Sequence, residues 1–69
     1  MNTVSVLSIG DNKFVDYCVK ADWNDAVDIA ERFVSQGAIA RVISDTYTPI
    51  VIFPESVKNR EYRLMVRSL

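Results

Sequence analysis

The chain has 69 residues, of which 49% are hydrophobic and 25% charged, and its formal net charge at pH 7 is −1. A chain of this length holds one hydrophobic core, so residues 1–69 are expected to form a single folded domain, and the composition excludes intrinsic disorder. No apolar run approaches the roughly 18 residues of a membrane span. The N-terminus also lacks a signal-peptide pattern, so we expect a cytoplasmic protein.

Several kinds of chemistry are missing from the composition. There is no histidine, and Cys18 is the only cysteine, which excludes an intramolecular disulfide, the usual zinc sites and the Ser-His and Cys-His pairs of hydrolases. Gly10 and Gly37 are the only glycines, too few for a phosphate-cradling loop or a dinucleotide-binding fingerprint. We therefore expect no enzymatic activity, no metal and no cofactor.

The small size and the charge distribution both favour a partner. A core of this size supplies roughly 3 to 5 kcal/mol, and small domains usually add a disulfide, a metal or a second subunit. Since the first two are excluded, we expect a homodimer. Residues 1–36 hold six acidic and three basic side chains, a balance of −3, whereas residues 37–69 hold three acidic and five basic ones, a balance of +2.

The N-terminal part of the chain predicts a β-hairpin. Thr3–Ile9 and Phe14–Lys20 are rich in β-branched and aromatic residues and alternate as strands do. Between them, Gly10–Lys13 (GDNK) has the composition of a tight turn.

The side chains of the second strand divide by alternation between the two faces of the sheet. Val15, Tyr17 and Val19 are expected to face the helix that follows. Phe14 and Cys18 then lie on the back of the sheet, an apolar pair that forms a candidate contact surface, with ordinary surface residues as the alternative interpretation.

The segment from Asp22 to Gly37 predicts one amphipathic helix. Asp22 has the properties of an N-cap, and Gly37 those of the residue that ends a helix. At about 100° per residue, the apolar side chains fall in one arc that should cover the sheet. They are Trp23, Ala26, Val27, Ala30, Phe33 and Val34, with Ile29 at the edge. Replacing Phe33 with alanine should cost about 3 to 5 kcal/mol if Phe33 is fully buried.

The remaining residues predict further strands at Ala38–Ser44 and Thr48–Phe53. Ser56–Asn59 is a loop or a helical turn, after which the alternation within residues 62–67 favours a fifth strand over a helix. The predicted fold is α+β: an antiparallel-rich sheet of four or five strands in the order ββαβββ, with one helix on one face. The strand-strand-helix-strand-strand order is similar to that of small proteins of bacteriophages and mobile elements, including inhibitors of bacterial defence complexes.

Two charged segments are candidate binding sites. Asp25, Asp28 and Glu31 recur every three residues on the predicted outer face of the helix, where they could meet a basic protein partner or a divalent cation. The basic side chains of the C-terminal segment could contact a partner or nucleic-acid phosphates. They are Lys58, Arg60, Arg63 and Arg67. For both segments, a solvated surface is the alternative interpretation.

With no catalytic or cofactor-binding apparatus, surface recognition is the main chemistry that the chain offers. The sequence predicts a non-enzymatic protein-binding module, a small regulator or inhibitor that occupies the surface of a partner protein. The alternative is a nucleic-acid-binding module that uses the basic C-terminal segment.

Overall fold

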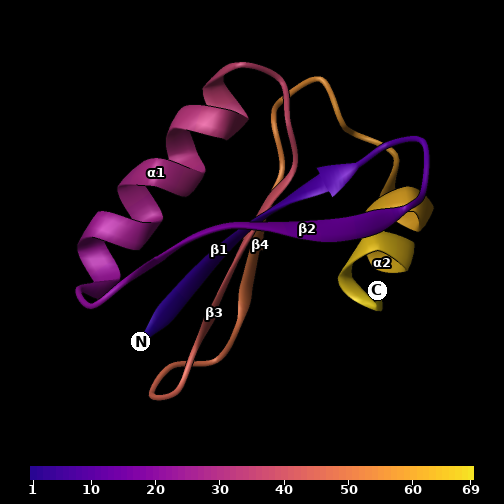
Figure 1. Ribbon diagram of the computed structural model, residues 1–69. Helices are drawn as coiled ribbons and strands as arrows, with labels where there is room; N and C mark the ends of the chain where they lie inside the picture. Colours follow the sequence, from indigo (N-terminus) through magenta and orange to yellow (C-terminus); the bar gives the residue numbers. More distant parts are fainter.

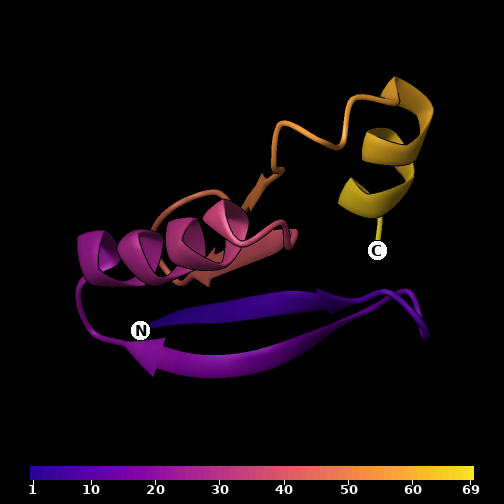
Figure 2. The same cartoon turned by 90° about the horizontal axis from the view of Figure 1, so that it is seen from above.

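A four-stranded antiparallel sheet forms the centre of the protein (Figure 1). The computed structural model describes residues 1–69. The strands are β1 (Asn2–Ser8), β2 (Lys13–Lys20), β3 (Ala40–Ser44) and β4 (Ile50–Ile52), in the spatial order β2-β1-β3-β4. The helices are α1 (Trp23–Ser35) and α2 (Arg60–Arg67), which lie toward opposite ends of the molecule (Figures 1 and 2). The predicted α+β class is confirmed.

Strands β1 and β2 form the predicted hairpin, and Asn12 in its turn adopts a positive φ of 53°. Asparagine tolerates this left-handed conformation better than most residues. The pairing shifts once, because Val4 is opposite Cys18 whereas Ser5 is opposite Asp16. Tyr17 is therefore the extra residue of a β-bulge, which changes the faces that the β2 side chains occupy.

Both ends of α1 follow the sequence signals. The Asp22 side chain accepts a hydrogen bond from the Asn24 backbone N–H (3.3 Å), which satisfies one of the free donors of the first turn. At the other end Gly37 has a φ of 95°, and the N–H groups of Gly37 and Ala38 donate to the carbonyls of Val34 and Phe33. This pair of bonds is a Schellman motif, which glycine forms without steric strain.

The main core lies between α1 and one face of the sheet and is built from small side chains. Five buried residues form it: Val4, Ala26, Ala30, Ala40 and Val42. Because alanines face each other from α1 and β3, the helix approaches the sheet closely. Phe33 packs against this core, as its place on the apolar arc predicted, but it is only half-buried, so the cost expected for a fully buried Phe33 does not apply.

The C-terminal segment is a helix, so the predicted fifth strand is wrong. The Asn59 side chain caps α2 by accepting a hydrogen bond from the Tyr62 backbone N–H (3.0 Å). The strand prediction assumed that Leu64, Met65 and Val66 all needed burial. Only Val66 is buried, and one apolar position is compatible with a short helix whose other faces meet solvent.

Helix α2 covers part of the opposite face of the sheet. Val66 joins Leu7 and Ile39 in a second buried cluster, against which Phe14 and Val51 pack. Neighbouring residues of a strand point to opposite faces, and Ile50 and Ile52 pack on the α1 side whereas Val51 packs on the α2 side. The sheet is thus covered on one face by α1 and, at one end of the other face, by α2.

Candidate functional site

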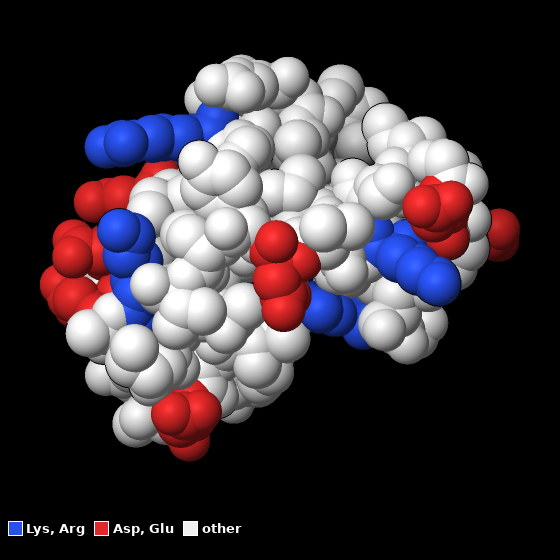
Figure 3. Space-filling model, viewed as in Figure 1, with Lys and Arg blue, Asp and Glu red and all other residues white.

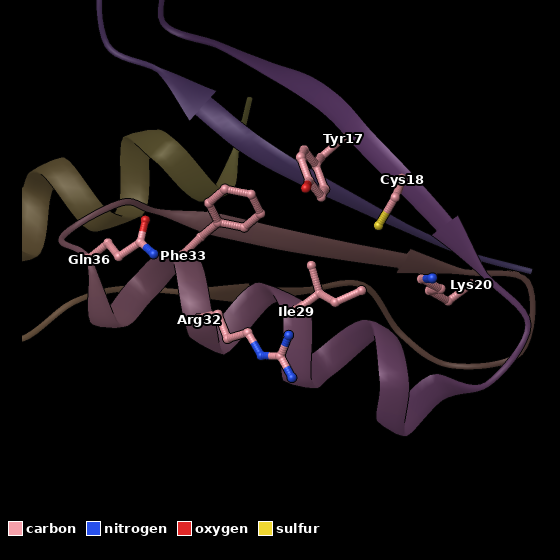
Figure 4. A pocket seen from close by; sticks show the side chains of 7 residues that line it. All are labelled: Tyr17, Cys18, Lys20, Ile29, Arg32, Phe33 and Gln36. Carbon is pink, nitrogen blue, oxygen red and sulfur yellow. The ribbon is translucent and has the colours of Figure 1, made fainter.

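Strand β2 is the longest strand and forms one edge of the sheet. Helix α1 lies mainly over β1 and β3, so β2 extends beyond the cover of the helix. Between β2 and α1 a groove with a volume of about 630 Å³ remains open. Its lining side chains, drawn in Figure 4, are Tyr17, Cys18, Lys20, Ile29, Arg32, Phe33 and Gln36.

The floor and wall of the groove are apolar. The Tyr17 ring meets the Phe33 ring edge to face, with centroids 4.8 Å apart and an interplanar angle of 78°. Cys18 projects from β2 toward Ile29 on α1 (Figure 4). These four side chains form a continuous apolar surface, into which an apolar side chain of another molecule fits.

The bulge at Tyr17 builds this groove, and it also corrects the prediction for Cys18. Alternation alone placed Phe14 and Cys18 together on the back of the sheet. Phe14 does lie there, in the α2 cluster, but Cys18 packs against the α1 core on the opposite face. Because the bulge inserts one residue, Tyr17 and Cys18 both face the helix. The two residues therefore do not form a shared contact surface.

Charged side chains of both signs stand at the rim. Lys20 and Arg32 line the groove and also line a smaller adjoining hollow with Asp25 and Asp28. None of these four makes an ion pair, since the only ion pair joins the N-terminal amino group to Asp45 (2.9 Å). Their charges are therefore free to meet complementary groups on a partner.

The acidic residues Asp25, Asp28 and Glu31 are all exposed on α1, as the sequence predicted. Acidic side chains gather along α1 on the left of Figure 3, with basic ones among them. No three carboxylate or thiol side chains lie close enough together to share a metal ion. The helix face thus offers a charged surface beside the groove.

The basic C-terminal residues divide into two groups. Arg63 and Arg67, one helical turn apart on α2, both place their guanidinium groups 5.1 Å from the centre of the Phe53 ring. Lys58 and Arg60 are exposed, and neither lies over an aromatic ring as Arg63 and Arg67 do. The structure adds Arg41, whose guanidinium stacks on Phe14 at 4.2 Å.

Sequence reasoning missed Arg41 because it stands alone within β3. Its neighbours come from β2 and from α2, the helix that was predicted as a strand, so no local pattern identified it. The available signal was one arginine between the apolar residues Ala40 and Val42 of β3.

Compared with models of protein families, with curated proteins and with solved structures, the chain matches none. Neither α1 nor α2 has the length and apolar character needed to cross a membrane. Any inference about function therefore depends on the geometry of this chain.

Proposed function

We propose that the protein is a non-enzymatic protein-binding module that regulates or inhibits a partner by occupying its surface. The binding surface is β2 together with the groove between β2 and α1. An extended segment of the partner pairs with the β2 edge, and one of its apolar side chains enters the groove. The observation that carries this proposal is the open edge strand beside an apolar groove.

The geometry of β2 supports strand addition. An edge strand presents unpaired backbone N–H and C=O groups, and peptide segments bind such edges by extending the sheet. Three apolar side chains of β2 are largely exposed: Val15 (58%), Tyr17 (63%) and Val19 (52%). On the back face, only the end of the sheet near α2 is covered. Pairing with a partner strand would bury apolar area that the single chain leaves in water.

The small size of the buried side chains also supports the proposal that the protein binds a partner. Among the fully buried side chains none is larger than valine, and all seven aromatic residues keep part of their surface exposed. Aromatic side chains carry the largest apolar areas, and they are enriched at protein interfaces. Binding to a partner would bury exposed aromatic surface of this protein, which supports the proposal.

The substitution Tyr17→Lys tests the proposal, because it places a charge on the β2 edge at the mouth of the groove. Sedimentation equilibrium first establishes whether the chain self-associates. If it forms a dimer, the partner strand is a second copy and Tyr17→Lys weakens the dimer; if it is a monomer, peptides selected from a random library provide the partner strand. In either case we expect the affinity to fall about tenfold or more, as for a central interface aromatic.

The matched control is Leu64→Lys on α2, since Leu64 is exposed to a similar extent (56%) but lies away from β2. This control should keep the wild-type affinity, and circular dichroism should show that both variants remain folded. Association that is insensitive to Tyr17→Lys, or equally sensitive to both changes, would refute the β2 surface.

A further inference from the structure

The two helices carry equal and opposite net charges. Helix α1 has three acidic side chains and one basic, a balance of −2, whereas α2 has three basic side chains and one acidic, a balance of +2. The acidic residues of α1 are Asp25, Asp28 and Glu31, and the basic residues of α2 are Arg60, Arg63 and Arg67. We call these two sets the acidic face and the basic face.

The basic face occupies one side of α2. At about 100° per residue, positions 60, 63 and 67 fall within an arc of about 60°. The guanidinium groups of Arg63 and Arg67 both lie 5.1 Å from the centre of the Phe53 ring, and the Arg63 Nε–H donates to the Val57 carbonyl (2.7 Å). Because these contacts order the two side chains, binding a partner costs them less conformational entropy.

The acidic face points away from the sheet. Its three residues are exposed and fall within an arc of about 120°, centred opposite the buried Ala26 and Ala30. Arg32 and Lys20 stand at one border, where they line a small hollow with Asp25 and Asp28. Asp22, also exposed, adds a further carboxylate at the start of the helix, so negative charge remains in excess.

Neither face meets its counter-charge within one chain. Helices α1 and α2 lie toward opposite ends of the molecule (Figures 1 and 2), and the only ion pair joins the N-terminal amino group to Asp45. In Figure 3 acidic side chains follow α1 on the left, and basic ones lie beside α2 on the right with acidic ones among them. The two faces can therefore be brought together only between two molecules.

We propose that the acidic face of α1 docks on the basic face of α2 in a second copy of the chain, so that copies associate head to tail. Charge complementarity carries this proposal, since guanidinium groups pair with carboxylates through parallel hydrogen bonds. The contact joins two different surfaces, so each copy keeps one free face of each sign, and association continues along a row or closes into a ring. The inference is independent of the proposed β2 surface.

Light scattering at low and high salt tests the proposal. Exposed ion pairs are individually weak and are screened by salt. Raising the salt concentration from about 0.01 M to about 1 M shortens the screening length from about 30 Å to about 3 Å. At low salt the mean mass should rise with protein concentration, and at high salt the head-to-tail contact should be lost. Association through the apolar β2 surface would persist at high salt.

Charge-reversed variants make the test specific. Asp28→Lys/Glu31→Lys reverses the acidic face and Arg60→Glu/Arg67→Glu the basic face, and all four residues are exposed, so circular dichroism should show folded proteins. Each variant alone should lose at least about tenfold in self-association, because like charges then meet. Mixed in equal amounts, the two should associate again, since each reversed face matches the reversed face of the other variant.

The matched control is Asp11→Lys/Glu55→Lys, which changes two exposed residues outside both helices. Each change from an acid to lysine adds two charges, so this control and the α1 variant both shift the net charge from −1 to +3. The control keeps both faces and should keep the wild-type self-association.

Three results would overturn the proposal. The first is a chain that stays monomeric at low salt, whether or not its basic face then binds an oligonucleotide. The second is association that the control weakens as much as the α1 variant does, because net charge would then be the cause. The third is association that Tyr17→Lys abolishes and the charge-reversed variants retain, which would assign it to the β2 surface.

Discussion

Replacing Ala30 with leucine is expected to destabilise the protein by about 1 to 3 kcal/mol, a large part of the 3 to 5 kcal/mol available to a domain of this size. Ala30 is fully buried between α1 and the sheet, in a core where Ala40 and Val42 leave no room for a longer side chain. The extra methyl groups must push α1 away from β1 and β3. For a domain of this length the midpoint of thermal unfolding should fall by roughly 4 to 24 °C.

Thermal unfolding followed by circular dichroism measures this effect, with Glu31→Leu as the control. Glu31 is the next residue of α1 and is exposed, so the same side chain there should change stability by no more than about 0.5 kcal/mol. If Ala30→Leu melts within a few degrees of Glu31→Leu, the close approach of α1 to the sheet is wrong.

Replacing Val66 with aspartate is expected to release α2 from the sheet while the α1 core stays folded. Val66 is the only fully buried residue of α2, and it packs against Leu7 and Ile39. A carboxylate at this position cannot stay in an apolar cluster without a partner, so the helix must move to reach water. The core around Val4 and Val42 contains no residue of α2 and should be unaffected.

Amide hydrogen exchange distinguishes the two parts of the fold. In Val66→Asp, the amides of α2 should lose their protection, whereas those of β1, β3 and α1 should keep most of theirs. Leu64→Asp places the same charge at an exposed position of α2 and serves as the control. Retained protection of α2 in Val66→Asp, or equal loss throughout the chain, would show that the two clusters are not separate units.

The sequence was sufficient for α1 because its signals are local. The Asp22 cap, the apolar arc and the Gly37 stop lie within sixteen consecutive residues, from 22 to 37, and each acts through the backbone or side chains of this segment. The hairpin was predictable for the same reason, since its turn residues are adjacent in the chain. Helix α2 also has a local cap in Asn59, but its two exposed apolar residues made the alternation of a strand equally consistent with the sequence.

The groove could not be predicted from sequence because it depends on one bulge. An extra residue at Tyr17 leaves no mark in composition or periodicity, yet it moves Cys18 from the back of the sheet to the α1 face. The surroundings of Arg41 depend on tertiary structure in the same way. Its guanidinium stacks on Phe14 of β2, a residue far from it in the sequence.

The most direct test of the β2 surface is the rate at which Cys18 reacts with a thiol-specific reagent in the presence and absence of a bound partner strand. Cys18 is the only cysteine, it is partly exposed, and it lines the groove. A strand on β2 with a side chain in the groove should slow the reaction at least about tenfold at saturation, because the population with an open groove becomes small. An unchanged rate at saturating partner would contradict the proposed binding surface.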